Sequence, residues 1–364
     1  MRILNVVGAR PNLMKMAPLI TEMARHPEIK QTLVHTGQHY DAKMSQIFFR
    51  ELGLPEPDVY LGIGSGSHAK QTARVMVGME KILLSDHYDV VTVVGDVNST
   101  LACSIAAVKL LVPVAHVEAG LRSFDRRMPE EINRVITDQI SAYLFTTSRD
   151  ADENLRREGI PSERIHLVGN VMIDTLMKHR ARAAQLNTPQ RFGLKAHQYA
   201  LLTLHRPSNV DDPQVFERLL DAVTQIQQKI PILFPAHPRT VRRIDEFGFA
   251  ERLRIARNLR VIDPLGYLEF LDMMMHAKLV LTDSGGIQEE TTILGIPCLT
   301  IRENTERPVT ITQGTNVLVG TNPERIVRQA QHVLERGSGT ASVPELWDGH
   351  AAERIVQVLQ AKTG

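Results

Sequence analysis

The most chemically specific segment of the sequence is 282–290, with the residues TDSGGIQEE. An apolar run ends there, a Ser-Gly-Gly turn follows, and a helical pattern begins. Free backbone N–H groups at such a helix start bind phosphate, because no side chain blocks them and the helix dipole favours negative charge. One of the carboxylates Glu289 and Glu290 would then accept hydrogen bonds from two ribose hydroxyls. The segment predicts a nucleotide site, although a plain strand-to-helix turn would use the same residues.

Acidic residues follow two apolar runs in the first half of the sequence. Asp96 follows the run 90–94, Glu118 follows the run 114–117, and the pair Glu130-Glu131 opens a helical pattern behind Pro129. Ligands in open parallel sheets bind outside the carboxyl ends of the strands, so we expect these acids at one rim. Clustered carboxylates raise each other's pKa values and suit proton transfer. The alternatives are turn or cap roles, and interaction of Glu130 and Glu131 with the helix dipole.

Two histidines stand at the ends of apolar runs in the second half. His205 is followed by Arg206, and His237 is followed two residues later by Arg239. A histidine with a nearby arginine at two strand ends suggests an anionic ligand. A structural role for each histidine is the alternative.

Short apolar runs alternate with helical patterns along the whole chain. The runs are apolar nearly end to end, which is typical of parallel strands covered on both faces and predicts a doubly wound α/β fold. The predicted strands are 3–7, 32–35, 90–94, 114–117, 143–146, 165–168, 200–204, 232–234, 259–262, 279–281 and 298–301.

The length of 364 residues corresponds to two domains of about 150 residues each. We expect an N-terminal domain over 1–171, a hinge or linker over 172–197, which has no strand pattern, and a C-terminal domain over 198–350. An amphipathic helix at 351–362 is expected to pack back on the first domain.

Composition excludes several classes of protein. Lys and Arg number 42 against 41 Asp and Glu, so no global basic field is available for nucleic acid. Two cysteines and scattered histidines predict neither a disulfide framework nor a bound metal. No apolar stretch reaches the roughly 18 residues of a membrane helix. We therefore expect a cytoplasmic protein that interacts with no membrane and no nucleic acid.

The segment GIGSGS at 62–67 nearly matches a dinucleotide-binding fingerprint. It ends in Ser where the fingerprint has Gly, and no convincing strand precedes it. We interpret it as a loop before a helix that begins near His68. No nicotinamide cofactor, and no other cofactor, is expected.

Seven stretches, in order over nearly the whole chain, resemble the non-hydrolysing bacterial UDP-N-acetylglucosamine 2-epimerases. They are TGQHYD at 36–41, VGD at 94–96, HVEAGLR at 116–122, PEE-x-NR at 129–134, LHR at 204–206, TDSGGIQEE at 282–290 and TERP at 305–308. The resemblance implies a GT-B-like fold, in which two Rossmann-like doubly wound domains face a central cleft. It also implies a homodimer.

The resemblance assigns roles to individual residues. The implied UDP-binding set is Arg10, Ser284, Gly285 and Gly286 for the diphosphate, Glu290 for the ribose, Tyr267 beside the uracil, and His237 and Arg307 in support of the phosphates. The implied catalytic set beside the sugar is Asp96, Glu118, Glu131 and His205. Gln38, His39 and Gln71 stand where the bacterial family can bind a second UDP-sugar as activator.

The chemistry agrees with this residue set. The C2 proton of the sugar lies next to no carbonyl carbon, so direct removal faces a high barrier. Expelling UDP first makes that proton acidic, and the resulting glycal adds UDP back after protonation on its other face. A tight diphosphate site stabilises the leaving group. Which carboxylate is the base and which the acid stays open.

Four alternatives remain at this point. A hydrolysing 2-epimerase would release N-acetylmannosamine and UDP. Another UDP-2-acetamido sugar, such as a diacetamido-uronate or a fucosamine derivative, is also possible, because Ser208 stands where the family often has Glu. A glycosyltransferase of the same fold and a non-enzymatic UDP-sugar sensor are the remaining two.

Overall fold

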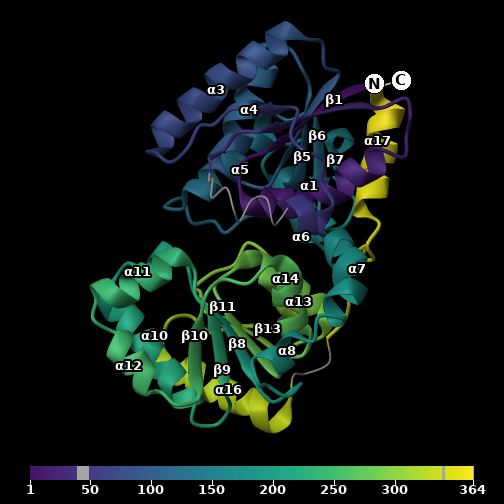
Figure 1. Cartoon of the computed structure of the whole chain (residues 1–364). Coiled ribbons are helices and arrows are strands. Elements are labelled where there is room, and N and C mark those ends of the chain that lie inside the picture. Colours follow the sequence, from purple (N-terminus) through teal and green to yellow (C-terminus); the bar gives the residue numbers. More distant parts are fainter. Residues whose placement is uncertain (39–48, 338–340, 364) are drawn as a thin grey trace. The chain divides into compact units, whose positions relative to one another are not determined.

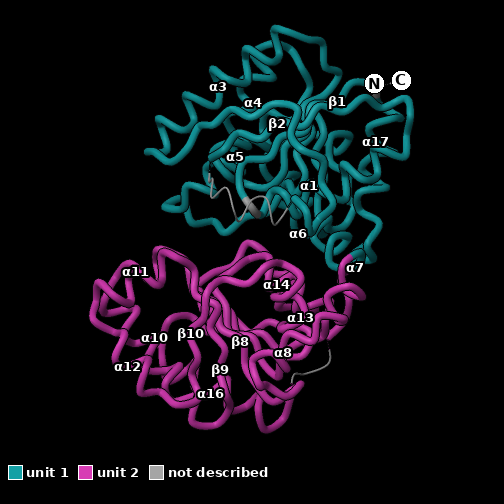
Figure 2. Tube along the Cα trace, viewed as in Figure 1, with its two compact units in different colours: residues 1–178, 345–364 teal, residues 179–344 magenta. Residues whose placement is uncertain are grey.

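The structure is a computed structural model that describes residues 1–38, 49–337 and 341–363. The chain forms two compact units (Figure 2). The first unit contains Met1–Lys178 and Glu345–Gly364, and the second contains His179–Pro344. Each unit is an α/β layer structure with its own parallel sheet.

The first unit is built on a seven-stranded parallel sheet with the order β3-β2-β1-β4-β5-β6-β7. Its strands are β1 (Arg2–Val7), β2 (Lys30–His35), β3 (Val59–Tyr60), β4 (Val90–Val94), β5 (Val114–Ala119), β6 (Tyr143–Thr146) and β7 (Ile165–Leu167). The helices are α1 (Arg10–Met23), α3 (His68–Ser85), α4 (Asn98–Lys109), α5 (Pro129–Ile140), α6 (Arg149–Arg157) and α17 (Ala351–Thr363), with α7 (Val171–Ala184) running from this unit into the second.

Alternate strand residues build the core of the first unit. Leu4 and Val91 point to the face covered by α3, where they belong to one cluster with Val75 and Met79. Burying such side chains on both faces of the sheet is the main favourable term in its folding. The strands are therefore apolar nearly throughout, as the sequence predicted.

The end of the chain returns to the first unit. Helix α17 lies beside α1, close to both chain ends (Figure 1), and Gln360 Nε2 donates to Glu28 Oε1 at 2.5 Å. Trp347 is 1% exposed, and its indole N–H donates to the carbonyl of Thr147 at 2.8 Å. This anchor explains why the chain leaves the second unit at Pro344, earlier than the expected domain end at 350.

The second unit is built on a six-stranded parallel sheet with the order β10-β9-β8-β11-β12-β13. Its strands are β8 (Ala200–Thr203), β9 (Ile232–Pro235), β10 (Leu259–Ile262), β11 (Leu279–Thr282), β12 (Cys298–Thr300) and β13 (Asn316–Leu318). Its helices are α8 (Thr188–Arg191), α9 (Pro207–Val210), α10 (Pro213–Ile226), α11 (Pro238–Glu246), α12 (Ala250–Ile255), α13 (Tyr267–Met275), α14 (Gly285–Leu294), α15 (Val309–Thr312) and α16 (Pro323–Arg336).

Both sheets have the strand order of a Rossmann fold, which confirms the predicted fold class. The order reverses between β1 and β4 in the first unit and between β8 and β11 in the second. Ligands of such sheets bind outside the carboxyl ends of the strands at this reversal. The residues that follow β1, β4, β8 and β11 are therefore where a site is expected.

Two of the strands were not predicted from the sequence. β3 has two residues and pairs at the sheet edge, too short to give a periodic signal. β13 begins with the polar Asn316, which is buried because its side chain donates to the carbonyl of Gln288 at 2.9 Å. The predicted linker 172–197 contains most of α7 and all of α8, and the change of unit after Lys178 falls inside α7. No helix in the described part of the chain could cross a membrane.

Candidate active site

Two of the predicted catalytic acids of the first unit share one arginine. Arg134 Nε donates to Asp96 Oδ2 at 3.0 Å, and its Nη1 contacts Glu131 Oε2. Asp96 follows β4, while Glu131 and Arg134 lie in the first turns of α5. Asn133 on the same helix donates to the backbone carbonyl of Asp96 at 2.8 Å. The start of α5 thus fixes the loop that carries Asp96.

Glu118 lies on the neighbouring strand end and pairs with Lys15 of α1. Its side chain is 4% exposed, and its backbone has φ 71°, a left-handed conformation that non-glycine residues adopt only at a cost. The register between β5 and β6 shifts at this point, between Val117 and Ala119. A strained backbone at a sheet end is common at functional sites.

Glu131 also anchors the loop before α5. Its Oε1 accepts the N–H of Phe124 at 2.8 Å, and its Oε2 accepts the N–H and the hydroxyl of Ser123 at 3.0 and 2.9 Å. Phe124 itself has φ 58°. The carboxylate of Glu131 is thus both a buried acid and the support of a strained turn.

The loop after β1 is fixed by Asn12. Its Oδ1 accepts the N–H groups of Gly8 and Ala9 at 3.3 and 2.9 Å, and its amide donates to the carbonyl of Val94 at 2.9 Å. Arg10 is the first residue of α1. Its side chain lies outside the described part of the chain.

Two residues of the predicted activator site contact each other. Gln71 Nε2 donates to the carbonyl of Gln38 at 3.3 Å, and Gln38 Oε1 accepts the N–H of Ser99 at 2.9 Å at the start of α4. The third, His39, lies outside the described residues. The helix beginning at His68 is confirmed, with Ser67 as its N-cap.

In the second unit, Asp283 holds the loop that carries His205. Asp283 follows β11 and is fully buried. Its carboxylate accepts the N–H of His205 and of Arg206 at 2.9 Å each, and its Oδ1 lies 2.8 Å from His205 Nδ1. Burial opposes ionisation of Asp283, but His205 and these backbone N–H groups outweigh it, so its pKa lies below the ordinary value. His205 is therefore oriented by Nδ1, which leaves Nε2 for a ligand.

The predicted phosphate site lies at the first residue of a helix. α14 begins at Gly285 with Ser284 as N-cap, so the N–H groups of its first turn have no acceptor within the helix. A Cβ at Gly285 would lie 2.6 Å from Arg307 Nη1. Glycine is needed there because the guanidinium packs directly against the helix start, where it adds positive charge.

Arg307 is held in that place by two acids. Its Nε donates to Glu289 Oε1 at 2.7 Å, and its Nη1 contacts Glu306. Glu306 also forms an ion pair with Arg302, whose Nη2 lies 2.7 Å from Glu306 Oε2. Glu289 is thus used as a partner of Arg307, which leaves Glu290 as the carboxylate suited to a ribose.

Glu290 is 3% exposed and accepts a hydrogen bond from Tyr267 Oη at 3.0 Å. Burial raises the pKa of Glu290 to about 8; the Tyr267 hydrogen bond opposes this, and the charge of Glu289 adds to it. Burial and Glu290 likewise raise the pKa of Tyr267. The two predicted contacts to ribose and uracil are therefore directly linked.

His237 is exposed at the N-cap of α11, where its Nδ1 accepts the N–H of Arg239 at 3.2 Å. Its ring centroid lies 6.0 Å from that of His205. The ends of β8 and β9 thus bring together the two histidines that the sequence singled out.

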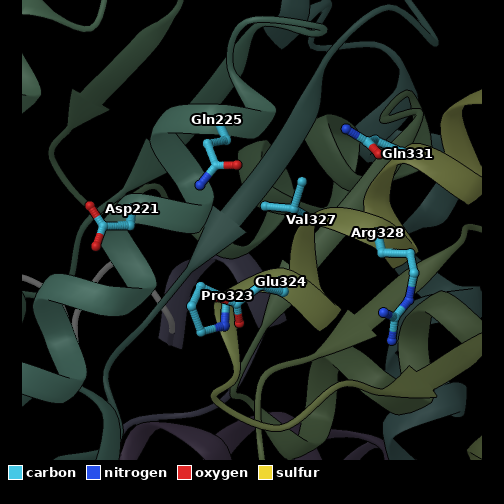
Figure 3. A pocket seen from close by; sticks show the side chains of 7 residues that line it. All are labelled: Asp221, Gln225, Pro323, Glu324, Val327, Arg328 and Gln331. Carbon is cyan, nitrogen blue, oxygen red and sulfur yellow. The ribbon is translucent and has the colours of Figure 1, made fainter.

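A hollow of about 360 Å³ lies elsewhere in the second unit, between α10 and α16 (Figure 3). It is lined by Asp221, Gln225, Pro323, Glu324, Val327, Arg328 and Gln331. None of the predicted site residues borders it. Among the described residues, no group of three His, Cys, Asp or Glu side chains is arranged to hold a metal ion.

Several contacts of the two sites were missed by the sequence analysis. The orienting roles of Asp283 and Arg134 and the Lys15 partner of Glu118 depend on pairings distant in sequence. Glu306 is adjacent to Arg307 in the sequence, and its contact was not predicted either. The position of Asp283 directly after a predicted strand was the one available signal.

The comparisons with known proteins agree along the whole chain. The family model described as UDP-N-acetylglucosamine 2-epimerase matches residues 21–360. The UDP-N-acetylglucosamine 2-epimerase of Methanocaldococcus jannaschii is 42% identical over 364 residues, covering 99% of each chain. The UDP-2,3-diacetamido-2,3-dideoxy-D-glucuronate 2-epimerase of Pseudomonas aeruginosa is also 42% identical over 364 residues, with 99% of each chain covered.

The solved structure of the Methanocaldococcus jannaschii enzyme in complex with UDP-GlcNAc and UDP superposes with a TM-score of 0.92. The match covers 99% of this chain and 100% of that one. By sequence and by fold, this chain belongs to the UDP-N-acetylglucosamine 2-epimerase family.

Proposed function

We propose that this protein interconverts UDP-N-acetylglucosamine and UDP-N-acetylmannosamine by eliminating UDP and adding it back. The observation that carries the proposal is the end-to-end match, at 42% identity, to a 2-epimerase whose solved structure contains UDP-GlcNAc and UDP. The side chains at the two sheet reversals support it, because they combine an anion site with buried carboxylates.

In the first step of the proposed reaction the bond between C1 and the β-phosphate oxygen breaks, and its electron pair leaves with UDP. The C2 proton passes to a protein base, and its electron pair forms the C1–C2 double bond of the glycal. A proton then reaches the opposite face of C2, and a UDP oxygen attacks C1. UDP is used and regenerated, so the reaction requires no oxidant.

We assign UDP binding to residues of the second unit and to Arg10 of the first. The N–H groups at the start of α14 and the nearby Arg307 would stabilise the charge that develops on the departing diphosphate. Ser284, Gly285 and Gly286 form this turn, and Arg10 and His237 are assigned to the phosphates with it. Glu290 would accept from the ribose, and Tyr267 would lie by the uracil.

We assign proton transfer to Asp96, Glu118, Glu131 and His205. The partners of the acids support this role: Lys15 and Arg134 compensate the buried Glu118 and Glu131 and the half-buried Asp96, and they fix the positions of these carboxylates. Fixed geometry is what general acid–base catalysis requires, since the acting group must reach the reacting proton at hydrogen-bond distance.

The proposal extends to regulation and assembly. The hydrogen bonds between Gln38, Gln71 and the start of α4 support a polar site there, which with His39 would take a second UDP-sugar as activator. We also propose a homodimer that works in the cytoplasm, by analogy with the bacterial members of the family.

One other substrate deserves equal testing. The Pseudomonas aeruginosa enzyme for the diacetamido-glucuronate sugar matches this chain at the same 42% identity. Ser208, next to the LHR motif, is exposed and departs from the Glu that is frequent in the family. A charged or doubly acetylated sugar is therefore the second candidate substrate.

Product analysis distinguishes these possibilities. The protein is incubated separately with UDP-N-acetylglucosamine and with the diacetamido-glucuronate nucleotide, and the sugars are identified by NMR. We expect a mixture of UDP-N-acetylglucosamine and UDP-N-acetylmannosamine from the first. Turnover of the second nucleotide alone would show that the diacetamido-glucuronate sugar is the substrate. Release of free N-acetylmannosamine with UDP would show that the protein is a hydrolysing 2-epimerase.

A further inference from the structure

One histidine of the first unit is fully buried and unused by the mechanism above. His116 in β5 is 0% exposed. Its Nδ1 lies 2.6 Å from Asp138 Oδ1, and its Nε2 lies 2.8 Å from the carbonyl oxygen of Gly95. Both ring nitrogens therefore face oxygen atoms within the protein.

Both of these oxygens act as acceptors. A backbone carbonyl has no proton to give, so Nε2 must donate to Gly95. Asp138 Oδ2 accepts the N–H of Gly120 at 3.1 Å and pairs with Arg122 Nη1 at 2.7 Å. Burial opposes ionisation of Asp138, but His116 and Arg122 outweigh it and hold its pKa below the ordinary value. Nδ1 therefore faces a carboxylate oxygen and Nε2 a carbonyl oxygen, so both ring nitrogens are placed to donate.

Charged side chains surround the ring of His116. Arg122 is 3% exposed and binds Glu158 through Nε and Nη2, at 2.8 and 2.7 Å. The cluster thus pairs one arginine with two carboxylates, Asp138 and Glu158, so an imidazolium at His116 would balance its charge. A buried charge is tolerated when it is paired and hydrogen-bonded in this way.

The cluster holds the backbone next to two of the proposed catalytic acids. The carbonyl bound by His116 precedes the N–H of Asp96 in the chain. The N–H bound by Asp138 belongs to Gly120, two residues after Glu118. Gly120 has φ 78°, and a Cβ there would lie 2.5 Å from the carbonyl oxygen of Ala151, so this backbone is packed closely. The strained backbone of Glu118 needs such support to persist.

We propose that His116, as a buried imidazolium paired with Asp138, is the positioning residue that fixes Asp96 and Glu118 for proton transfer at C2. The positioning role depends on the proposed function. The protonation state of the ring does not, so the two are tested separately.

The protonation state is measured by NMR on protein labelled with ¹⁵N-histidine. The signals of His116 are assigned as those lost in His116→Gln. We expect both ring nitrogens to carry a proton at about pH 8, where an exposed histidine is neutral. A single ring proton at that pH would show that the ring is neutral and would overturn the proposed protonation state, whether or not the protein is an epimerase.

The positioning role is measured by kinetics of His116→Gln, since a glutamine amide donates to Gly95 or to Asp138 but not in the geometry of the ring. We expect kcat to fall about 100-fold, as for a small misplacement of catalytic groups, with KM and UDP affinity within about twofold of wild type. Asp138→Asn keeps the shape and removes the charge, and we expect kcat to fall about tenfold or more.

His166→Gln is the matched control, because His166 is a partly buried strand histidine of the same unit with its ring 5.8 Å from that of Phe145. We expect its kcat to stay within about twofold of wild type. Fluorescence of Trp347 checks that the first unit of each variant is folded. An unchanged kcat in folded His116→Gln would overturn the positioning role, whereas a wild-type protein that epimerises nothing would overturn the proposed function and the role with it.

Discussion

At the residue scale, the acids of the two sites are compensated in different ways. In the first unit Asp96, Glu118 and Glu131 each contact a buried or nearly buried cation, Arg134 or Lys15. In the second unit Glu290 accepts a hydrogen bond from the phenol of Tyr267, and burial raises its pKa to about 8. Pairing with a cation fixes the position of a carboxylate, whereas a carboxyl with a raised pKa changes its charge near neutral pH.

Replacing one paired acid tests the assignment of proton transfer directly. Asp96→Asn and Glu118→Gln keep the size of each side chain and remove its charge. We expect kcat to fall by about 100- to 10,000-fold, because the amide accepts no proton from carbon. Isothermal titration should show UDP affinity unchanged, since the residues assigned to UDP binding do not include Asp96 or Glu118.

Glu153→Gln serves as the control for these variants. Glu153 is an exposed acid on α6 that pairs with Arg157 at 3.1 Å, a surface contact of little energetic value. Its kcat should equal that of wild type. Full activity of both Asp96→Asn and Glu118→Gln would remove these carboxylates from the mechanism.

At the element scale, the sequence predicted the sheets well and the pairing of side chains poorly. Nearly every apolar run became a strand at the expected position, because burial on both faces leaves a strong signal in a short stretch. The start of α14 at Ser284–Gly286 was also visible, since two consecutive glycines at a helix start are a local feature. The partners Asp283–His205 and Arg134–Asp96 were not, because they depend on strand order, which brings residues 38 to 78 positions apart into contact.

The start of α14 is the element on which UDP binding is expected to depend. Gly285→Ala places a methyl group 2.6 Å from Arg307 Nη1, and the guanidinium is restrained by Glu289 and Glu306. The helix start or the arginine must move. We expect the Kd for UDP, measured by titration calorimetry, to rise about tenfold or more, which corresponds to about 1.4 kcal/mol.

Gly193→Ala is the matched control in the same unit. Gly193 has φ 66° and no atom near its missing Cβ, so the variant strains the backbone without touching the helix start. It should lower stability while leaving the Kd for UDP at the wild-type value. Equal Kd values for the two variants would show that the start of α14 does not bind UDP.

Glu290 predicts how stability depends on pH in the ligand-free protein. Its pKa rises from 4.5 to about 8 on folding, so the folded state keeps a proton that the unfolded state has lost. The resulting stabilisation is complete below about pH 4.5 and is lost as the pH rises towards 8, by at most about 1.4 kcal/mol per pH unit. The variant Glu290→Gln has no carboxyl group at this position, so its stability should not show this decrease with pH.

Thermal unfolding followed by circular dichroism measures the effect between roughly pH 5 and pH 8. The Tm of wild type should fall relative to that of Glu290→Gln as the pH rises. Parallel pH profiles for the two proteins would mean that Glu290 is ionised throughout this range in the folded state.

At the scale of the whole molecule, the chain forms one unit from both of its ends. Asp174 caps the returning helix α17, with its carboxylate oxygens accepting the N–H groups of Ala351 and Ala352 at 3.1 and 2.7 Å. Trp347 is the one tryptophan of the sequence, and it is buried in the first unit. Its fluorescence therefore reports the unfolding of that unit.

Asp174→Ala is expected to destabilise the first unit by about 1–2 kcal/mol, as for loss of a good helix cap. The midpoint of the Trp347 fluorescence transition in urea should fall, while the affinity for UDP stays unchanged. Asp348→Ala, which removes an exposed partner of Arg354 on the same returning segment, is the control and should shift the midpoint much less. Equal shifts would show that the cap contributes nothing beyond a surface contact.

The proposed reaction depends on transient loss of the C2 proton after UDP has left. The most direct measurement is incubation with UDP-N-acetylglucosamine in deuterated water, with mass spectrometry and NMR of the recovered nucleotides. We predict deuterium at C2 of both the gluco and the manno epimer, with UDP still attached. Epimers formed without deuterium at C2 would contradict the elimination mechanism.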